Sequence, residues 1–535
     1  MRKGFYLATS NKQPGRRDVA RAVPTFAPLM LPTADTKKVA LPVRRAPWLL
    51  AALLAVAGLR LWRLPEAGPP DYDSVHNWQV VQELAHGHFT QLFHHGSPGF
   101  FLFYAPAGIL TRNFLVFQTL NALLGLAGLA LFAGWVARQA RLSGPETAGL
   151  TLLVGTSLLL TFSGRDFTMS SLDLVLFAGL LRSHFARLRR PGPAAVLRVA
   201  AWLAAGLSVD YKFLLLLPIL VVLEVGRADG QWRQRGLWAR VLLVLAAPYL
   251  LLGAVGVAAG LPWYRWLGFY FRTVVPAAAN TAGRQGTLHL DLGYYPRYLL
   301  AYESPLLLAG LLLAGWLGWR AWQAGRRYTN CPLSLRPYLL VWAGCLLAGM
   351  SLLIKAPRGL LFAYLPLAAL AVLSSRRLLP GRARAGLLLA ALALNVFRIQ
   401  REIYAPLPTP YPRVAAWLRQ HGATSVVSTA SLGLAPYLTE HQRLAVITDE
   451  HQLTSLRRQG YQYVLLDGYW RVAGVAGFDS LRRQVPVAAW PAPQLHRPLL
   501  FLEHSEFTGL GYAETLAACQ AATADTLPLR LYQLR

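Results

Sequence analysis

The stretch 114–136 reads FLVFQTLNALLGLAGLALFAGWV and carries no charged side chain from one end to the other. An α-helix needs about 20 predominantly apolar residues to cross a bilayer, so this stretch is long enough to span one. Several of the other apolar stretches are shorter than a perpendicular span, and a further piece at 100–110 has the length of a re-entrant segment. There are ten others, at 47–61, 147–163, 169–185, 194–209, 213–225, 241–258, 306–319, 338–354, 360–373 and 385–396. The sequence therefore predicts an α-helical polytopic membrane protein with about 11–13 transmembrane helices.

The composition agrees with a membrane protein. Of 535 residues, 55% are hydrophobic and only 14% are charged, with a net charge of +29. In a soluble chain this charge would suggest nucleic-acid binding, but the basic residues lie scattered between the apolar stretches instead of forming one face. We therefore expect no nucleic-acid partner. The cysteines Cys331, Cys345 and Cys519 lie far apart without CxxC spacing, so we expect neither a disulfide framework nor a zinc module.

The distribution of Lys and Arg predicts the orientation, because cytosolic loops retain positive charge. Residues 1–46 are polar and basic and lack the apolar core of a secretory signal, so we expect a cytosolic tail. With that end inside, Lys and Arg are roughly three times as dense in the inner loops as in the outer segments, which include 63–113 and 259–304. The richness in Arg, Ala and Leu is typical of GC-rich bacterial coding. We therefore expect a multi-pass protein of a bacterial inner membrane.

The tail beyond the transmembrane region 47–400 has a different character. Its apolar runs shorten and its polar residues increase, and the parity of the spans places it outside the cell. Helical spacing at 411–421 and 449–459 alternates with strand-like runs at 425–429, 444–448 and 461–467. This alternation predicts that residues 401–535 form a small extracytoplasmic α/β domain.

Acidic residues beside the membrane are the first candidates for chemistry. Asp71 and Asp73 follow a Pro-Pro turn, and 74–86 has the spacing of a helix lying on the membrane surface. The N–H groups at such a helix start favour ionised carboxylates, which suits them as acceptors or general bases, although an ordinary N-cap is the alternative for one of them. Asp173 lies inside an apolar stretch, where an unpaired charge costs several kcal/mol. It is a candidate site residue, with a structural ion pair to Arg165 as the alternative.

Basic residues fall at the outer ends of several apolar stretches, namely Arg165, Lys212, Lys355 and Arg358. Each alone can anchor a helix at the interface, but together, on the same side as the acids, they favour a shared phosphate-binding site. Histidines crowd the first outer segment, and His76 and His95 are candidates for substrate binding. No HExxH spacing groups them, so the sequence defines no metal site, although a divalent metal is the one cofactor we consider, and solvated imidazole is the simpler interpretation.

The order of these motifs resembles that of the GT-C class of membrane glycosyltransferases, especially the protein O-mannosyltransferase and aminoarabinose transferase superfamily. That family opens its first outer loop with an Asp-Glu pair, and here Ser74 follows Asp73. Its second acid, deep in an apolar helix after a Ser/Arg stretch, resembles Asp173. The likeness covers about residues 47–400 and includes Asp73-Ser-Val-His76, Gly87, His95-Gly-Ser-Pro98, Ser163, Arg165, Gly206 through Lys212, and Lys355, Arg358 and Pro366.

The resemblance implies an enzyme that transfers a hexosyl or pentosyl group from a polyprenyl-phosphate carrier to a hydroxyl of a lipid, glycan or protein acceptor, with inversion. It implies that Asp73 is the general base and that Asp71 and Asp173 orient sugar, acceptor or a metal. The phosphate would be bound by the later cations, Lys355, Arg358 and Lys212, and by Arg165. Two alternatives remain at this point, a ligase resembling oligosaccharyltransferases and a transporter or flippase of a lipid-linked substrate.

Overall fold

The computed structural model describes residues 45–68, 72–225, 234–263, 265–266, 290–323, 334–353, 355–475, 477–524 and 529–534. All of them belong to one compact unit, Leu41–Arg535. Nearly all of the predicted cytosolic tail lies outside the described residues, as do Asp71, Cys331 and most of the predicted outer segment 259–304.

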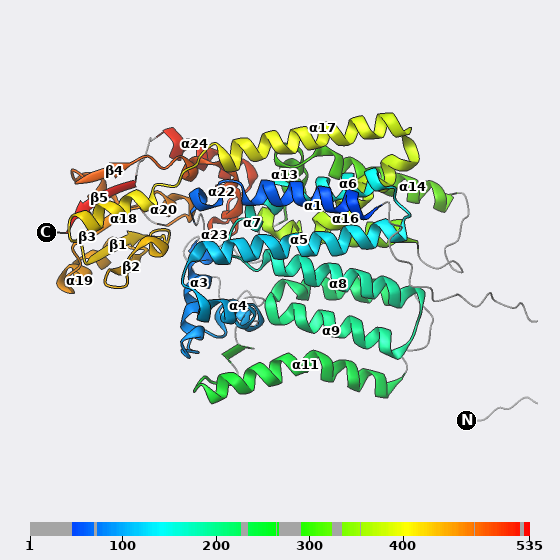
Figure 1. Ribbon diagram of the computed structural model, residues 1–535, viewed down its shortest axis with the longest axis horizontal. Coiled ribbons are helices and arrows are strands. Elements are labelled where there is room, and N and C mark those ends of the chain that lie inside the picture. Colours follow the sequence, from blue (N-terminus) through cyan, green and yellow to red (C-terminus); the bar gives the residue numbers. More distant parts are fainter. Residues whose placement is uncertain are drawn as a thin grey trace, which may run out of the picture. The chain divides into compact units, whose positions relative to one another are not determined.

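Helices make up most of this unit (Figure 1). Each of the eleven predicted stretches, and the piece at 100–110, overlaps one helix or an adjoining pair. The helices up to position 260 are α1 (Ala46–Leu61), α2 (Leu64–Ala67), α3 (Tyr72–Ala85), η1 (His94–Gly96), α4 (Pro98–Leu110), α5 (Phe114–Gln139), α6 (Gly144–Gly155), α7 (Leu158–Gly164), α8 (Ser170–Arg189), α9 (Pro193–Val209), η2 (Tyr211–Leu216), α10 (Leu217–Val225) and α11 (Arg235–Ala258). The later ones are α13 (Tyr294–Tyr302), α14 (Pro305–Gln323), α15 (Leu335–Met350), η6 (Pro357–Leu360), α16 (Leu361–Leu378), α17 (Gly381–Ile399) and η7 (Gln400–Tyr404).

The prediction of a polytopic helical membrane protein is confirmed. Within the described residues, six helical segments are long and apolar enough to cross a membrane, and the number rises to seven if α6 and α7, bent by 66°, count as one span. Helices α4, α9 and α15 are apolar but shorter. The larger total of 11–13 spans therefore stays a prediction.

The helices pack as neighbours along much of their length (Figure 1). Helix α5 contacts α1 and α8, α9 lies between α8 and α11, and α16 contacts both α14 and α15. The side chains of α16 are buried from Leu361 to Ser375, so this helix belongs to the core of the bundle. Large apolar side chains on α11, such as Leu243 and Leu251, are exposed, which is the surface expected of a helix that faces lipid.

The break between α6 and α7 depends on a buried carboxylate far away in the sequence. The Glu303 carboxylate accepts a hydrogen bond from Ser157 Oγ at 3.1 Å. It also accepts the backbone N–H groups of Leu158 and Leu159, at 3.0 and 2.9 Å. These are donors that the first turn of a helix leaves unpaired. Glu303 therefore caps α7, the helix that leads directly to Asp166 in the site described below.

The C-terminal part contains a five-stranded sheet in the order β2-β1-β3-β5-β4. Strand β1 pairs in parallel with β2 and β3, whereas β5 is antiparallel to β3 and β4. The predicted alternation of helix and strand between 411 and 467 is confirmed, but the last two strands were not predicted. The elements are α18 (Tyr411–Gln420), β1 (Ser425–Thr429), η8 (Ala435–Tyr437), β2 (Arg443–Ile447), α19 (Gln452–Arg458), β3 (Tyr463–Leu466), α20 (Tyr469–Val472), α21 (Asp479–Arg482), β4 (Ala488–Trp490), η9 (Pro493–His496), α22 (Pro498–Glu503), α23 (Ser505–Thr508), α24 (Tyr512–Ala524) and β5 (Leu529–Gln533).

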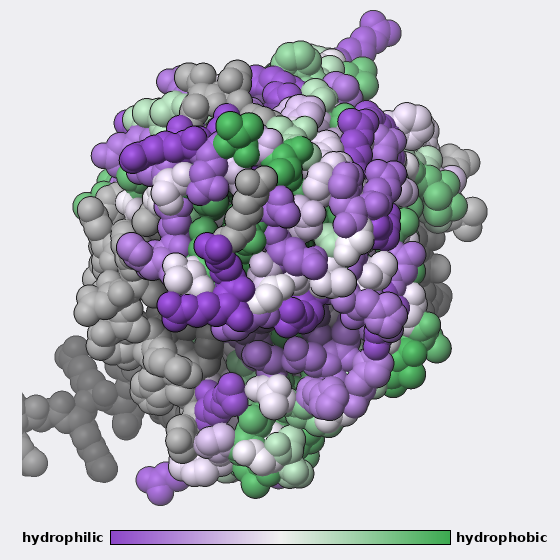
Figure 2. Space-filling model, turned by 90° about the vertical axis from the view of Figure 1, so that its left-hand side faces the viewer, coloured by the Kyte–Doolittle hydropathy of each residue, from purple (hydrophilic) through white to green (hydrophobic). Residues whose placement is uncertain are grey.

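The sheet lies beyond one end of the helices, and α3 lies at the same end (Figure 1). Figure 2 looks onto this end and shows mainly hydrophilic side chains. Inside it, Val414 and Leu418 of α18 are fully buried in one core with Leu465 of β3. Tyr72 and Phe162 from the helical part pack against this same core, so the C-terminal sheet region and the first outer helix share a packed boundary.

Candidate active site

A cavity of about 300 Å³ lies where α3, the turn after α7, the start of η2, η6 and the α22–α23 segment come together. It thus joins segments from the beginning, the middle and the end of the chain. Most of the side chains that carry charge in it are acids. The ionisable lining residues are Asp73, His95, Asp166, Asp210, Tyr211, Lys212, Arg358, Glu503 and Glu506.

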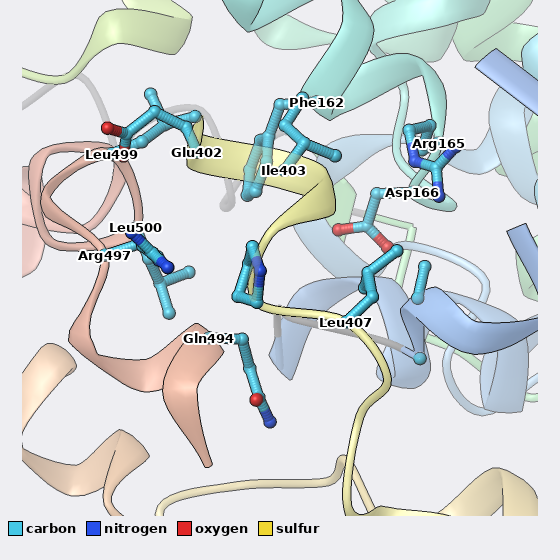
Figure 3. Close-up of a pocket in the computed structure, with 13 residues that line it drawn as sticks. Phe162, Arg165, Asp166, Glu402, Ile403, Leu407, Gln494, Arg497, Leu499 and Leu500 are labelled. Carbon is cyan, nitrogen blue, oxygen red and sulfur yellow. The ribbon is translucent and has the colours of Figure 1, made fainter. Parts of the chain in front are cut away.

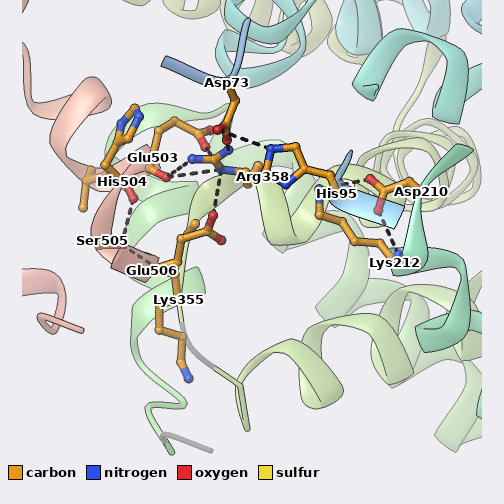
Figure 4. A network of polar contacts seen from close by, with 12 residues as sticks. Asp73, His95, Asp210, Lys212, Lys355, Arg358, Glu503, His504, Ser505 and Glu506 are labelled. Atoms are coloured by element: carbon orange, nitrogen blue, oxygen red, sulfur yellow. Dashed lines mark hydrogen bonds and ion pairs between the residues drawn. The ribbon is translucent and has the colours of Figure 1, made fainter. Parts of the chain in front are cut away.

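Asp73 lies in the first turn of α3, and two basic side chains face it (Figure 4). His95 Nε2 lies 3.5 Å from one carboxylate oxygen, and Arg358 Nη1 lies 3.8 Å from the other. Burial opposes ionisation of Asp73, but the hydrogen bond from His95 and the charges of His95, Arg358 and His504 outweigh it and hold its pKa below the ordinary value. Asp73 is therefore ionised at neutral pH and able to accept a proton.

Arg358 is held by the C-terminal part of the chain (Figure 4). Its Nη2 and Nε donate to the backbone carbonyl of Glu503, at 2.9 and 3.3 Å. Its Nε also lies 3.3 Å from the Glu503 carboxylate and 3.6 Å from that of Glu506. The planar guanidinium presents Nε and Nη2 along one edge to the Glu503 carbonyl, and Nη1 lies toward Asp73. Together with Asp73, three carboxylates surround one cation.

A second charged group lies on another wall of the cavity. Lys212 Nζ lies 3.1 Å from the Asp210 carboxylate, whose other oxygen accepts the Lys212 backbone N–H at 2.9 Å. Asp173, in the first turn of α8, is fully buried, and Asp210 and Lys212 are the charged groups that act on it. Asp173 does not line the cavity itself.

Ser74 has a definite role, although the family resemblance would place Glu there. Its hydroxyl donates to the Asp166 carboxylate. The Phe167 backbone N–H donates to Ser74 Oγ at 3.0 Å and to the Asp166 carboxylate at 2.9 Å. Asn121 Nδ2 donates to the Asp166 carbonyl at 2.6 Å. Ser74 thus links α3 to the loop after α7, and Asp166 supplies a carboxylate to the cavity wall beside Asp73.

Three other predicted site residues lie outside the lining of this cavity. Lys355 turns away from the carboxylates in Figure 4 and donates to the Leu353 carbonyl. Arg165 donates to the carbonyls of Arg60 and Trp62, both at 2.7 Å, so it ties α7 to the end of α1. His76 stacks on Tyr72 at 5.8 Å and meets the edge of His94 at 4.3 Å.

A smaller pocket of about 60 Å³ adjoins the central cavity and shares Phe162 and Asp166 with it (Figure 3). Arg165 lines this smaller pocket, together with Glu402 and Arg497. Its volume is about one fifth of that of the central cavity, so it is the less suitable of the two for a sugar. It lies on the boundary between the helical part and the α22 segment.

The sequence did not predict that the C-terminal domain contributes to this site. The run Glu503-His-Ser-Glu506, which follows the apolar 498–502, was a signal, because two acids and a histidine come together there. His504 is buried, and its Nε2 lies 2.6 Å from the Tyr469 hydroxyl, which in turn accepts the Tyr72 backbone N–H. Within the described ranges, no group of three or more His, Cys, Asp or Glu side chains is arranged to hold a metal ion.

Comparisons with solved structures address the fold. ArnT from Cupriavidus metallidurans in the apo state superposes with a TM-score of 0.55 and 13% identity, over 84% of this chain and 96% of that one. The chain has a GT-C fold. This confirms the architecture that the motifs predicted.

Two further solved structures match less closely. ArnT bound to undecaprenyl phosphate gives a TM-score of 0.44 and 16% identity, over 90% of this chain and 79% of that one. The second is the oligosaccharyltransferase AglB from Archaeoglobus fulgidus, in complex with an inhibitory peptide and a dolichol-phosphate. It gives a TM-score of 0.45 and 11% identity, over 79% of this chain and 70% of that one. No protein-family model and no curated protein sequence matches the chain.

Proposed function

We propose that this protein is an integral membrane glycosyltransferase that moves a sugar from a polyprenyl-phosphate carrier to an acceptor hydroxyl on the extracytoplasmic side. One observation carries the proposal. In a chain with a GT-C fold, a carboxylate from α3 and cations from η2 and η6, which are far apart in the sequence, line a single cavity. The end of the molecule that carries the C-terminal sheet and α3 is mainly hydrophilic (Figure 2). The helices, in contrast, carry exposed apolar side chains.

The charges in this cavity suit both halves of the transfer. Arg358 and Lys212 would contact the donor phosphate, because a guanidinium and an ammonium both stabilise the negative charge that grows on a departing phosphate. The acidic lining residues Asp166 and Asp210 offer acceptors to sugar hydroxyls. The lipid tail would lie between the helices, and the acceptor is a hydroxyl of a lipid, glycan or protein.

In the reaction, the acceptor oxygen attacks the anomeric carbon and its proton passes to the Asp73 carboxylate. The bond between the anomeric carbon and the phosphate oxygen breaks, and the electron pair leaves with polyprenyl phosphate. A single displacement of this kind inverts the anomeric configuration. Asp73 is available for this role because it lines the cavity and because His95 and Arg358 keep it ionised. Asp173, which is fully buried, would keep Asp210 and Lys212 in position.

The experiment that tests this proposal uses the purified protein in lipid nanodiscs with a panel of polyprenyl-phosphate sugars. Asp73→Asn keeps the size of the side chain but removes the base, so transfer should fall by about 10²–10⁴-fold. Size-exclusion profiles and thermal midpoints of both proteins would establish that the variant is folded. Transfer by Asp73→Asn within threefold of wild type would remove Asp73 from the role of base, and the lack of any product with wild type would count against the proposed function itself.

A further inference from the structure

Arg358 lies among more negative charge than one cation neutralises. Its guanidinium lies within 4 Å of three carboxylates, those of Asp73, Glu503 and Glu506. Asp166 and Asp210 line the same cavity. Its other basic lining residues are Lys212, which is already paired with Asp210, and His95, which faces Asp73. A phosphate that enters this cavity therefore meets repulsion at the side chain best suited to bind it.

The two glutamates from the C-terminal domain hold Arg358 in different ways. Glu503 ends α22, its side chain is 5% exposed, and its backbone carbonyl accepts two hydrogen bonds from the guanidinium. Glu506 lies on the short α23, its side chain is 26% exposed, and it reaches Arg358 by one ion pair of 3.6 Å. Glu503 therefore makes more contacts with Arg358, and Glu506 is the more exposed of the two glutamates, with the fewer contacts.

We infer that Glu506 is an anionic placeholder for the donor phosphate. Without donor, it is the third carboxylate beside the Arg358 guanidinium, 3.6 Å from Nε. The phosphate of a polyprenyl-phosphate sugar then takes the place of the Glu506 carboxylate beside Arg358 Nε, while the Glu503 carbonyl keeps its hydrogen bonds from Nε and Nη2. This inference rests on the proposed function, and it gives the C-terminal domain a part in setting the affinity for the donor.

The prediction is that Glu506→Gln binds the donor phosphate more tightly than wild type. Removing one unit charge a few ångströms from the incoming phosphate should lower the Kd by about five- to tenfold in a hydrated cavity. Farnesyl phosphate serves as a soluble probe, and its binding to purified full-length protein is measured by isothermal titration calorimetry. Inorganic phosphate is titrated in parallel, to distinguish the lipid-linked phosphate from the bare anion.

Glu440→Gln is the matched control, because it also removes one glutamate charge and one arginine partner, Arg112, on an exposed surface outside the cavity. It should leave the Kd unchanged, whereas Glu506→Gln should tighten binding of both ligands by a similar factor, with inorganic phosphate the weaker of the two. An unchanged or raised Kd in Glu506→Gln overturns the inference. So does a lower Kd for farnesyl phosphate that is not matched by a lower Kd for inorganic phosphate. If wild type and Glu506→Gln both fail to bind farnesyl phosphate, the inference and the proposed function both fail.

Discussion

The cap that Glu303 places on α7 is the structural element that leads into the site, and it can be tested without any knowledge of the substrate. Glu303→Ala would leave the N–H groups of Leu158 and Leu159 and the hydroxyl of Ser157 without their carboxylate partner in a fully buried place. A lost hydrogen bond to a charged group costs about 1.5–3 kcal/mol, and these three donors share one carboxylate with the Tyr298 hydroxyl, which donates at 3.4 Å. We therefore expect a loss of about 3–5 kcal/mol of unfolding free energy.

Thermal unfolding of the purified protein in detergent measures this loss. The entropy of unfolding of a chain this long is about 1 kcal/mol/K, so the midpoint should fall by roughly 3–5 °C. Glu514→Gln is the control, because Glu514 is a carboxylate near a helix start that accepts a backbone N–H, that of Gly511 at 2.9 Å, in an exposed place. Its midpoint should change by less than about 1 °C. A Glu303→Ala midpoint equal to that of wild type would refute the assignment of the cap to Glu303.

Two further predictions concern the charges around Asp73. Arg358→Lys keeps the positive charge but cannot contact the Glu503 carbonyl and the carboxylates at once, so kcat/KM should fall by about 10–100-fold. Activity equal to wild type would show that the planar arrangement of the guanidinium donors is irrelevant. His95→Gln removes a group that lowers the Asp73 pKa, so that pKa should rise. Because ionised Asp73 is the active form, the acidic limb of the kcat/KM profile should move to higher pH in His95→Gln. An unmoved limb would contradict this electrostatic role of His95.

The sequence was a good guide to the helices, because an apolar run of spanning length rarely forms anything but a helix that crosses a membrane. It also predicted that Asp73 and Arg358 belong together, since Asp73 lies in the first outer segment and Arg358 at the outer end of an apolar stretch, on the side assigned to the outside by the Lys and Arg distribution. What it did not predict were contacts across long separations. Ser74 contacts Asp166, and Glu503 contacts Arg358, through tertiary packing that no local pattern records.

The same limit explains Lys355 and Arg165. Both lie at the ends of apolar stretches and carry the charge that a phosphate needs, so sequence position alone favours them as much as Arg358. In the structure their donors bond to backbone carbonyls, because helix ends leave carbonyls that a nearby cation can satisfy. Which cation faces the cavity is decided by the direction of each side chain, and periodicity does not specify that direction at a helix end.

If the protein acts as proposed, a lipid-linked phosphate binds in the cavity between α3, η2 and η6. The most direct measurement is a cryo-electron microscopy structure of the full-length protein in nanodiscs with undecaprenyl phosphate. We expect phosphate density within about 3–4 Å of the Arg358 guanidinium, inside the cavity that Asp73, Lys212 and Glu506 line. Phosphate density only at the opposite end of the helices, with this cavity empty, would contradict it.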